Sequence, residues 1–134
     1  MRKIVVIDGQ GGKIGSLLVS RLKAETNCEI YAIGTNSIAA SAMLKAGADY
    51  GAAGENPVIV NSRDAGVIIG PIGIIAADSL LGEVTPAMAA AVGQSPAVKV
   101  LLPINRCNNY VVGVRAMPIP DLIDETIKYV LTII

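Results

Sequence analysis

Residues 8–15 are Asp8-Gly9-Gln10-Gly11-Gly12-Lys13-Ile14-Gly15, and this stretch decides how the rest of the chain is interpreted. It follows the apolar run 3–7, which is typical of a buried parallel strand. It leads into residues 13–25, where apolar side chains recur at helical spacing. Glycines at such a junction let the backbone approach a phosphate, which the free N–H groups of the helix N-terminus would bind. The stretch therefore predicts a phosphate-binding loop, and the alternative is a tight turn without a ligand.

The spacing of the glycines is Gly9-x-x-Gly12-x-x-Gly15, with Gly11 in addition. The dinucleotide fingerprint G-x-G-x-x-G is not met, because Ile14 stands three residues after Gly11. The observed spacing resembles the loop of extended and atypical short-chain dehydrogenases/reductases. Those enzymes use a Tyr-x-x-x-Lys motif, and none of the four tyrosines here has a lysine four residues later. Hydride transfer of that type is therefore not expected.

Strands and helices are expected to alternate along nearly the whole chain. Strands are predicted at residues 3–7, 29–33, 57–60, 65–69, 98–102 and 110–114, and helices at 13–25, 37–46, 74–81, 85–92 and 120–131. This alternation predicts an α/β fold, a Rossmann-like three-layer sandwich with a mostly parallel sheet of five to six strands. With 134 residues, residues 1–134 are expected to form a single domain.

Polar residues and glycines gather at the predicted carboxyl ends of the strands, where parallel sheets bind ligands. The candidate ligand-binding residues are Gly9, Gln10, Gly11, Gly12, Lys13, Ile14, Gly15, Thr35, Asn36, Gly70, Pro71, Asn105 and Arg106. Arg106 could hold a phosphate or carboxylate through two parallel hydrogen bonds. Cys107 beside it is a candidate nucleophile. The chain has no histidine, which excludes a Cys–His pair and a Ser–His–acid triad. The alternative for this segment is an ordinary polar loop.

The end of the second predicted strand lacks the acid that usually binds the ribose hydroxyls of NAD. Thr35, Asn36 and Ser37 stand there instead. They could bind a ribose or cap the following helix, and both roles stay open. Asp78 and Glu83 are expected to be a solvated acid and a helix-end charge rather than an acid–base pair. The sequence thus predicts phosphate recognition. It leaves open whether the cofactor is NAD(P) or another nucleotide.

Composition excludes several classes of partner. The net charge is zero and aromatic residues make up 3%, which argues against a nucleic-acid surface. Without histidine, a C-x-x-C pair or an acidic cluster, no metal site is expected. The longest apolar region, residues 67–92, is interrupted by glycine, proline and two acids, so no membrane span is expected.

Charged residues make up only 16% of the chain, against about 25% in a typical soluble domain. This shortage predicts that part of the surface is buried in a homo-oligomer, most simply a dimer. Two cysteines and no export signal predict a cytoplasmic protein with reduced thiols.

Several segments together resemble a small bacterial family that is classed as a domain of unknown function. These segments are residues 7–15, 34–36, 41–48, 70–73 and 105–108, so the resemblance extends over nearly the whole chain. The resemblance implies a compact Rossmann-like unit and no particular activity.

Three functional hypotheses follow. The first is a small nucleotide- or dinucleotide-binding protein with a regulatory role, whose phosphate lies on the Gly9–Gly15 loop. The second is an enzyme that combines this loop with Arg106 and Cys107. The third is an oligomeric interaction module in which the glycine loop is purely structural.

Overall fold

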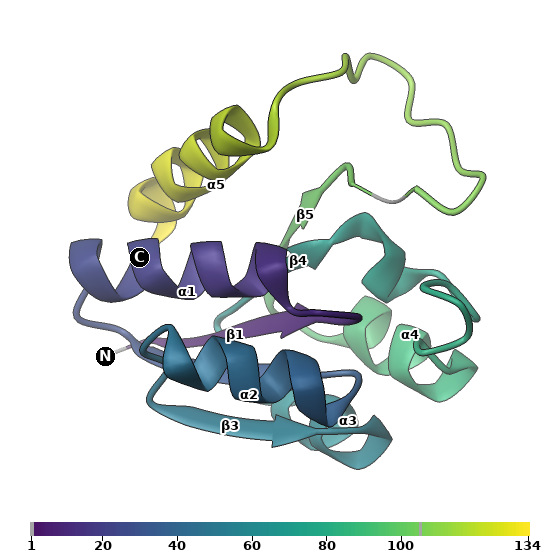
Figure 1. Ribbon diagram of the computed structural model, residues 1–134, viewed down its shortest axis with the longest axis horizontal. Helices are drawn as coiled ribbons and strands as arrows, with labels where there is room; N and C mark the ends of the chain where they lie inside the picture. The colour runs from purple at the N-terminus through teal and green to yellow at the C-terminus, as the bar shows by residue number, and fades with distance from the viewer. Residues whose placement is uncertain (1, 105) are drawn as a thin grey trace.

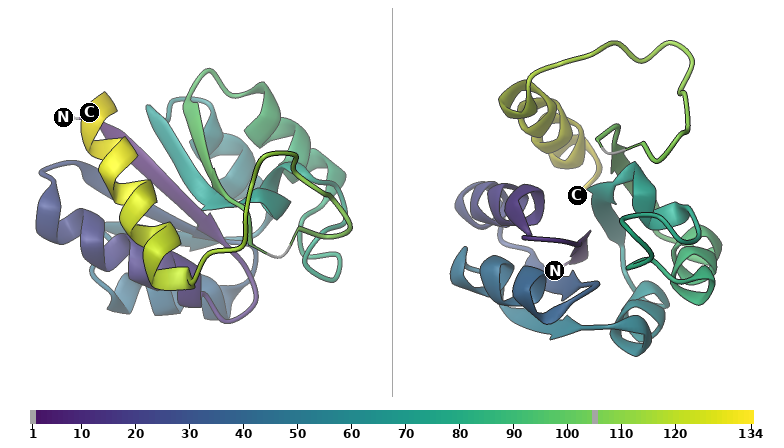
Figure 2. Two further views of the ribbon diagram at one scale, coloured as in Figure 1. Left: turned by 90° about the horizontal axis from the view of Figure 1, so that it is seen from above. Right: turned by 45° about the vertical axis from the view of Figure 1, so that its right-hand side comes forward.

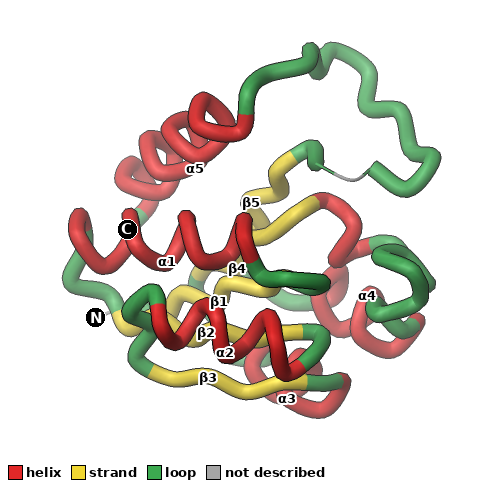
Figure 3. Tube along the Cα trace, in the orientation of Figure 1, coloured by secondary structure: helices red, strands yellow, loops and turns green. Residues whose placement is uncertain are grey.

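The structure is a computed structural model, and it describes residues 2–104 and 106–134. Asn105, one of the candidate ligand residues, lies outside the described residues. The strands are β1 (Lys3–Asp8), β2 (Glu29–Gly34), β3 (Tyr50–Ala53), β4 (Val67–Pro71) and β5 (Val98–Leu102). The helices are α1 (Lys13–Glu25), α2 (Ser37–Lys45), α3 (Glu55–Ser62), the short 3₁₀ helix η1 (Ile72–Ile75), α4 (Pro86–Gln94) and α5 (Ile119–Ile133) (Figure 3).

The five strands form one sheet in the order β3-β2-β1-β4-β5, and every neighbouring pair is parallel. This is the order of the first five strands of the Rossmann fold. The predicted α/β class and Rossmann-like architecture are therefore confirmed, with five strands in the described part of the chain. The order reverses beside β1, because β2 follows on one side and β4 is placed on the other.

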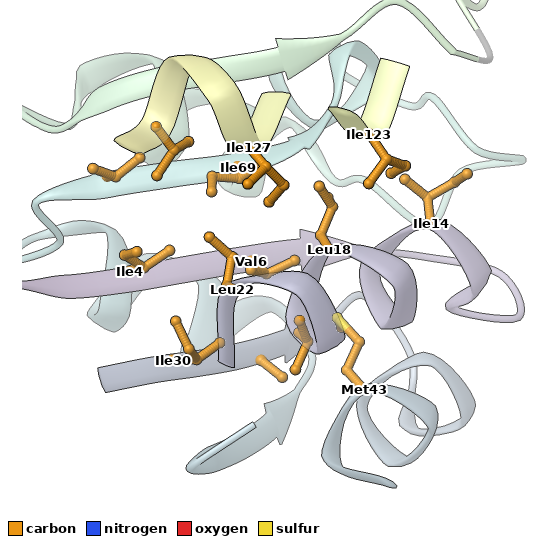
Figure 4. Close-up of a cluster of buried hydrophobic side chains, with 14 of the residues drawn as sticks. Ile4, Val6, Ile14, Leu18, Leu22, Ile30, Met43, Ile69, Ile123 and Ile127 are labelled. Atoms are coloured by element: carbon orange, nitrogen blue, oxygen red, sulfur yellow. The ribbon is translucent and has the colours of Figure 1, made fainter. Parts of the chain in front are cut away.

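Helices cover both faces of the sheet (Figures 1 and 2). On one face α1, α2 and α5 pack on alternate residues of the strands, such as Ile4 and Val6 of β1 (Figure 4). On the other face α3, α4 and η1 pack on Val5 and Ile7. Since β1 is buried on both faces, its central residues 4–7 are all apolar. Among the described residues no helix is long and apolar enough to cross a membrane.

Two predicted strands are wrong. Residues 57–60 belong to helix α3. The N-cap of this helix is Gly54, which has a φ of 107°. Pro57 lies in the first turn of that helix, where its missing N–H costs nothing. The third strand is instead Tyr50–Ala53, which the sequence does not predict because glycine and alanine are poor strand formers. Residues 110–114 form no strand either, and belong to a long connection between β5 and α5.

Other elements differ in their bounds. Strand β4 lies two residues later than predicted, at Val67–Pro71. The helix predicted at 74–81 is reduced to η1, followed by a turn-rich segment. The other predicted strands and helices are confirmed to within about two residues at each end, which is the usual uncertainty of where a frayed element ends.

Helix α4 begins as the sequence predicts, with Thr85 as N-cap and Pro86 in the first turn. The Thr85 hydroxyl accepts a hydrogen bond from the Met88 N–H at 3.1 Å. Thr85→Ala should therefore lower the free energy of unfolding by about 1 kcal/mol. Urea denaturation checks this value, and Thr85→Ser, which keeps the hydroxyl, should be close to the wild type.

Candidate functional site

The candidate site lies at the carboxyl edge of the sheet, where the strand order reverses beside β1. Asp8 ends β1 and is paired in register with Gly34, the last residue of β2. Pro71 ends β4 on the other side of β1. In open α/β sheets this reversal creates the crevice in which ligands bind. The loop from Gly9 to Gly12, hereafter the glycine loop, leaves β1 at this point and enters α1 (Figure 1).

Asp8 is buried, with 6% of its surface exposed, and its carboxylate organises the glycine loop. One oxygen, Oδ1, accepts the N–H of Gly9 at 2.8 Å, and Oδ2 accepts the N–H of Gly15 at 2.7 Å. Gly12, the N-cap of α1, has no side chain to serve as a cap, so Asp8 supplies the acceptor from the preceding strand. Burial raises the pKa of Asp8; the two backbone hydrogen bonds oppose this rise, and the nearby charge of Glu83 adds to it.

Three of the four glycines in residues 9–15 lie close against neighbouring residues. A Cβ at Gly9 would lie 2.6 Å from Oγ1 of Thr35, and a Cβ at Gly12 would lie 2.8 Å from Cα of Ala39 in α2. Gly12 also has a φ of 73°, in the left-handed region. A Cβ at Gly15 would lie 2.9 Å from Cβ of Asp8, so this glycine brings α1 close to β1.

Gly11 differs from the other three. A Cβ there would meet nothing within 4 Å, and the residue is exposed. Packing of the described residues therefore does not explain a glycine at this position. Gly11 is exposed, whereas Gly9 and Gly12 are buried.

Glu83 reaches the same place from a distant part of the chain. Its Oε1 accepts the N–H of Gln10 at 2.9 Å, the hydroxyl of Thr35 at 2.7 Å and the amide of Asn36 at 2.7 Å. Burial raises the pKa of Glu83, but these three hydrogen bonds outweigh it and hold the pKa below its ordinary value. The expectation of a simple helix-end charge is therefore wrong for Glu83, whereas Asp78 is exposed as expected.

Thr35 and Asn36 lie beside Glu83 at the end of β2. The Thr35 N–H donates to the Asp8 carbonyl at 2.9 Å. Asn36 is the N-cap of α2, where its Oδ1 accepts the N–H of Ala39 at 2.8 Å. Of the two roles that the sequence left open for these residues, helix capping is confirmed for Asn36. Its Nδ2 also donates to the carbonyl of Gln10 at 3.0 Å.

Residues 76–85, hereafter the crevice loop, carry Glu83 and adopt a strained backbone. Asp78, Leu80 and Leu81 have φ values of 66°, 55° and 57°, in the left-handed region that costs a non-glycine residue roughly 1–2 kcal/mol. The loop is held by a hydrogen bond from the Asp78 N–H to the Val84 carbonyl at 2.7 Å. Such strain is common at ligand-binding segments. The side chain of Leu80 is buried, and that of Leu81 is 95% exposed.

The structure does not place the second group of candidates on the glycine loop. Arg106 donates from Nε to the Pro103 carbonyl at 3.2 Å and lines a cavity of about 240 Å³ with Arg115, Met117 and Leu122. Cys107 is exposed, with a φ of 49°, and lines an open cavity of about 550 Å³ with residues 76–81 of the crevice loop. Cys107 is therefore near the crevice loop, while Arg106 faces away toward α5.

The remaining candidates have structural surroundings. A Cβ at Gly70 would meet the Ile7 carbonyl oxygen, so this glycine keeps β4 close to β1. Pro71 is buried at the end of β4. Lys13 is exposed in the first turn of α1, and Ile14 is buried. In the described part of the chain no three His, Cys, Asp or Glu side chains are grouped to hold a metal ion.

Comparison with known proteins gives a family but no activity. The family described as Domain of unknown function (DUF3842) matches residues 3–134. No curated protein matches the chain. A solved structure described as a dodecameric FMN-dependent Ubix-like decarboxylase from Escherichia coli O157:H7 is similar at 22% identity and a TM-score of 0.42, covering 99% of this chain and 76% of that one. These matches do not support the resemblance of the glycine loop to short-chain dehydrogenases/reductases.

Proposed function

This chain belongs to the family described as Domain of unknown function (DUF3842), and we propose that it binds a small nucleotide in the crevice beside β1. The phosphate lies on the glycine loop and the start of α1, and the ribose lies on Glu83. The observation that carries the proposal is the placement of the Glu83 carboxylate between the ends of β1 and β2. The sequence has no acid at the end of β2, and Glu83 provides one there from the crevice loop.

The phosphate would be bound by backbone N–H groups. The N–H groups of Lys13 and Ile14 open α1, where a helix has no acceptor of its own for them. The backbone of Gly11, where an added Cβ would meet nothing within 4 Å, lies between Gln10 and these two N–H groups. Together with the dipole of α1 and the exposed ammonium of Lys13, these groups favour an anion.

The ribose would be bound by the second oxygen of Glu83. The three hydrogen bonds that this carboxylate makes with described residues all go to Oε1, and Oε2 would accept from a diol. A carboxylate in this place would accept hydrogen bonds from the ribose hydroxyls of a dinucleotide, as the usual acid at the end of β2 does. Because Asp8 and Glu83 add negative charge around the loop, a ligand with few phosphate charges, such as a dinucleotide, fits better than a nucleoside triphosphate.

A structural role of the loop is the competing function. Close packing explains Gly9, Gly12 and Gly15 without a ligand, which favours an interaction module. Gly11 is the residue that separates the two functions, because no packing contact requires a glycine there.

The binding test uses variants that spare the fold. Purified protein is titrated by calorimetry with NAD, NADP, ATP, FAD and coenzyme A, and we expect binding to at least one of them. Gly11→Glu places a negative side chain in open space and should abolish that binding. Glu83→Gln removes the charged acceptor for the ribose, a loss that should raise Kd about tenfold or more.

Two controls accompany these variants. Glu55→Gln, which alters an exposed acid of α3, should bind as the wild type does. Urea denaturation of each variant checks that the fold is retained. Wild-type protein that binds none of the five ligands, and that shows no bound nucleotide in native mass spectrometry, would leave the interaction module as the better description.

A further inference from the structure

The connection between β5 and α5 turns back on itself. Residues 106–118, hereafter the arm, contain no helix or strand and stand away from the sheet before they return to α5 (Figures 1 and 2). The return is made at a turn, in which the Val114 N–H donates to the Val111 carbonyl at 3.3 Å and Gly113 has a φ of 85°. Long connections of this kind are uncommon in compact domains and are usually functional. The turn brings Val114 and Arg115 to the space between β5 and α5.

Two neighbouring cavities lie between β5, the arm and α5. The first, of about 400 Å³, has mainly apolar walls, which include Val100, Leu102 and Tyr129. The second, of about 240 Å³, lies at the start of α5, where Ile119 lines it. The two cavities adjoin, because they share four lining residues: Pro103, Arg115, Met117 and Leu122.

Arg106 and Arg115 both line the second cavity, and no described acid does. The guanidinium of Arg106 lies against the cavity wall, because its Nε donates to the carbonyl of Pro103 at 3.2 Å. That bond uses one of the five N–H donors of a guanidinium, and the other donors can hold a carboxylate through two parallel hydrogen bonds. Neither arginine forms an ion pair with an acid among residues 2–104 and 106–134. An anion between these two like charges would therefore be attracted by both.

The start of α5 adds to the positive end of this space. The N-cap of the helix is Pro118, which offers no side-chain acceptor, so the positive end of the helix dipole lies beside the second cavity. Asp121 in the first turn opposes the dipole, but this acid is exposed and does not line the cavity. Glu125 lines the first cavity and not the second. The negative group of a ligand thus belongs in the second cavity, and its apolar part in the first.

We propose that this pair of cavities binds a small aliphatic carboxylate, with the carboxylate between Arg106 and Arg115 and the chain along the apolar wall of the first cavity. The charged residues that line the two cavities are two arginines and one glutamate, so their net charge is +1. The single charge of a carboxylate balances it, whereas a phosphate monoester would leave an excess of negative charge. Arg106, a candidate ligand-binding residue in the sequence, then serves this site and not the nucleotide crevice.

The first test is a calorimetric titration of the wild-type protein with octanoate and with octanamide. We expect one octanoate per chain. Octanamide has the same chain without the charge and should bind at least about tenfold more weakly. Along the series butanoate, hexanoate and octanoate, the affinity should rise by up to about fourfold for each CH₂ that enters the first cavity. Octanamide that binds as tightly as octanoate, or an affinity that does not rise with chain length, would overturn the proposal.

The second test places the carboxylate at the two arginines. Arg106→Gln and Arg115→Gln should each raise the Kd of octanoate about tenfold or more. The corresponding lysine variants keep the charge but lose the planar pair of donors, so their losses should be smaller. Arg63→Gln, which alters an exposed arginine at the C-cap of α3, is the matched control and should bind octanoate as the wild type does. Urea denaturation checks that each variant is folded. A Kd unchanged in both glutamine variants, or raised equally in Arg63→Gln, would contradict the site.

The third test separates this site from the nucleotide crevice. The described residues that line the two cavities include none from the glycine loop or the crevice loop. Gly11→Glu, which should abolish nucleotide binding, should therefore leave the Kd of octanoate unchanged. Octanoate should also protect Arg106 and Arg115, but not Arg63, from modification by phenylglyoxal, as read by peptide mass spectrometry. Wild-type protein that binds no octanoate, loss of octanoate binding in Gly11→Glu, or absence of protection at both arginines would each overturn the proposal and leave the nucleotide site to its own test.

Discussion

Gly12→Ala should lower the free energy of unfolding by about 2–4 kcal/mol. This loss is the sum of two costs: an alanine in the left-handed region, and a collision of its Cβ with backbone atoms. Gly12 has a φ of 73°, and the added Cβ would lie 2.8 Å from Cα and 2.9 Å from the carbonyl oxygen of Ala39. Neither atom can move without shifting α2. Urea denaturation at neutral pH measures the loss.

Gly11→Ala is the matched control for this prediction. It adds the same methyl group one residue earlier, where nothing lies within 4 Å, and it should change the free energy of unfolding by less than about 0.5 kcal/mol. Equal losses at the two positions would contradict the packing argument. The comparison also shows that ligand binding is best tested at Gly11, since substitutions at Gly12 disturb the fold itself.

Asp8→Ala should cost a similar amount, about 2–4 kcal/mol, because it leaves two buried N–H groups without an acceptor. These are the N–H groups of Gly9 and Gly15, at 2.8 and 2.7 Å from the carboxylate. Asp8→Asn keeps one acceptor oxygen and should cost about half as much. Chemical denaturation of both variants measures these losses, and an Asp8→Ala protein as stable as the wild type would contradict the capping role.

The pH dependence of Asp8→Asn has a defined sign. Burial raises the pKa of Asp8 in the folded state above that of the unfolded chain, so the folded state takes up its proton at the higher pH. Proton uptake by Asp8 therefore stabilises the folded wild type as the pH falls from the raised pKa toward 3.8, the ordinary value for an aspartate. Asp8→Asn has no such gain in stability. The difference in stability between wild type and Asp8→Asn should widen over that range. A difference that narrows would mean that the two hydrogen bonds outweigh burial.

Strands and helices with a strong local pattern are predictable from this sequence. The apolar run of residues 4–7 predicts β1, the mainly apolar segment Val98–Leu102 predicts β5, and a helical stripe predicts α1. Strand β3 is not predicted because its residues are selected by a neighbouring helix rather than by strand propensity. Gly51 of β3 lies beside α2, where an added Cβ would be 2.6 Å from Leu44 Cδ1, so a side chain there would require Leu44 to move. Residues 57–60 are predicted as a strand but form a helix, because four consecutive apolar residues are compatible with a buried strand and with a helix.

The site is predictable in its location but not in its full composition. A glycine-rich turn after an apolar strand marks the crevice because both features are local. Glu83 is 73 residues from Gln10 in the sequence, and its hydrogen bond to that residue follows from the path of the crevice loop. Nothing near Glu83 in the sequence distinguishes it from a solvated acid. Contacts of this range depend on tertiary structure and have no local signal.

The carboxylate of Asp8 has a consequence for how firmly a nucleotide could be held. It already occupies the Gly15 N–H at the start of α1, so part of the positive end of that helix is neutralised from inside the protein. An incoming phosphate would gain only the attraction that is left, and it would also meet the negative charge of Glu83. For the proposed ligand this favours weak, rapidly exchanging occupancy that follows the nucleotide concentration around the protein. Such exchange suits a sensor better than a permanently loaded carrier.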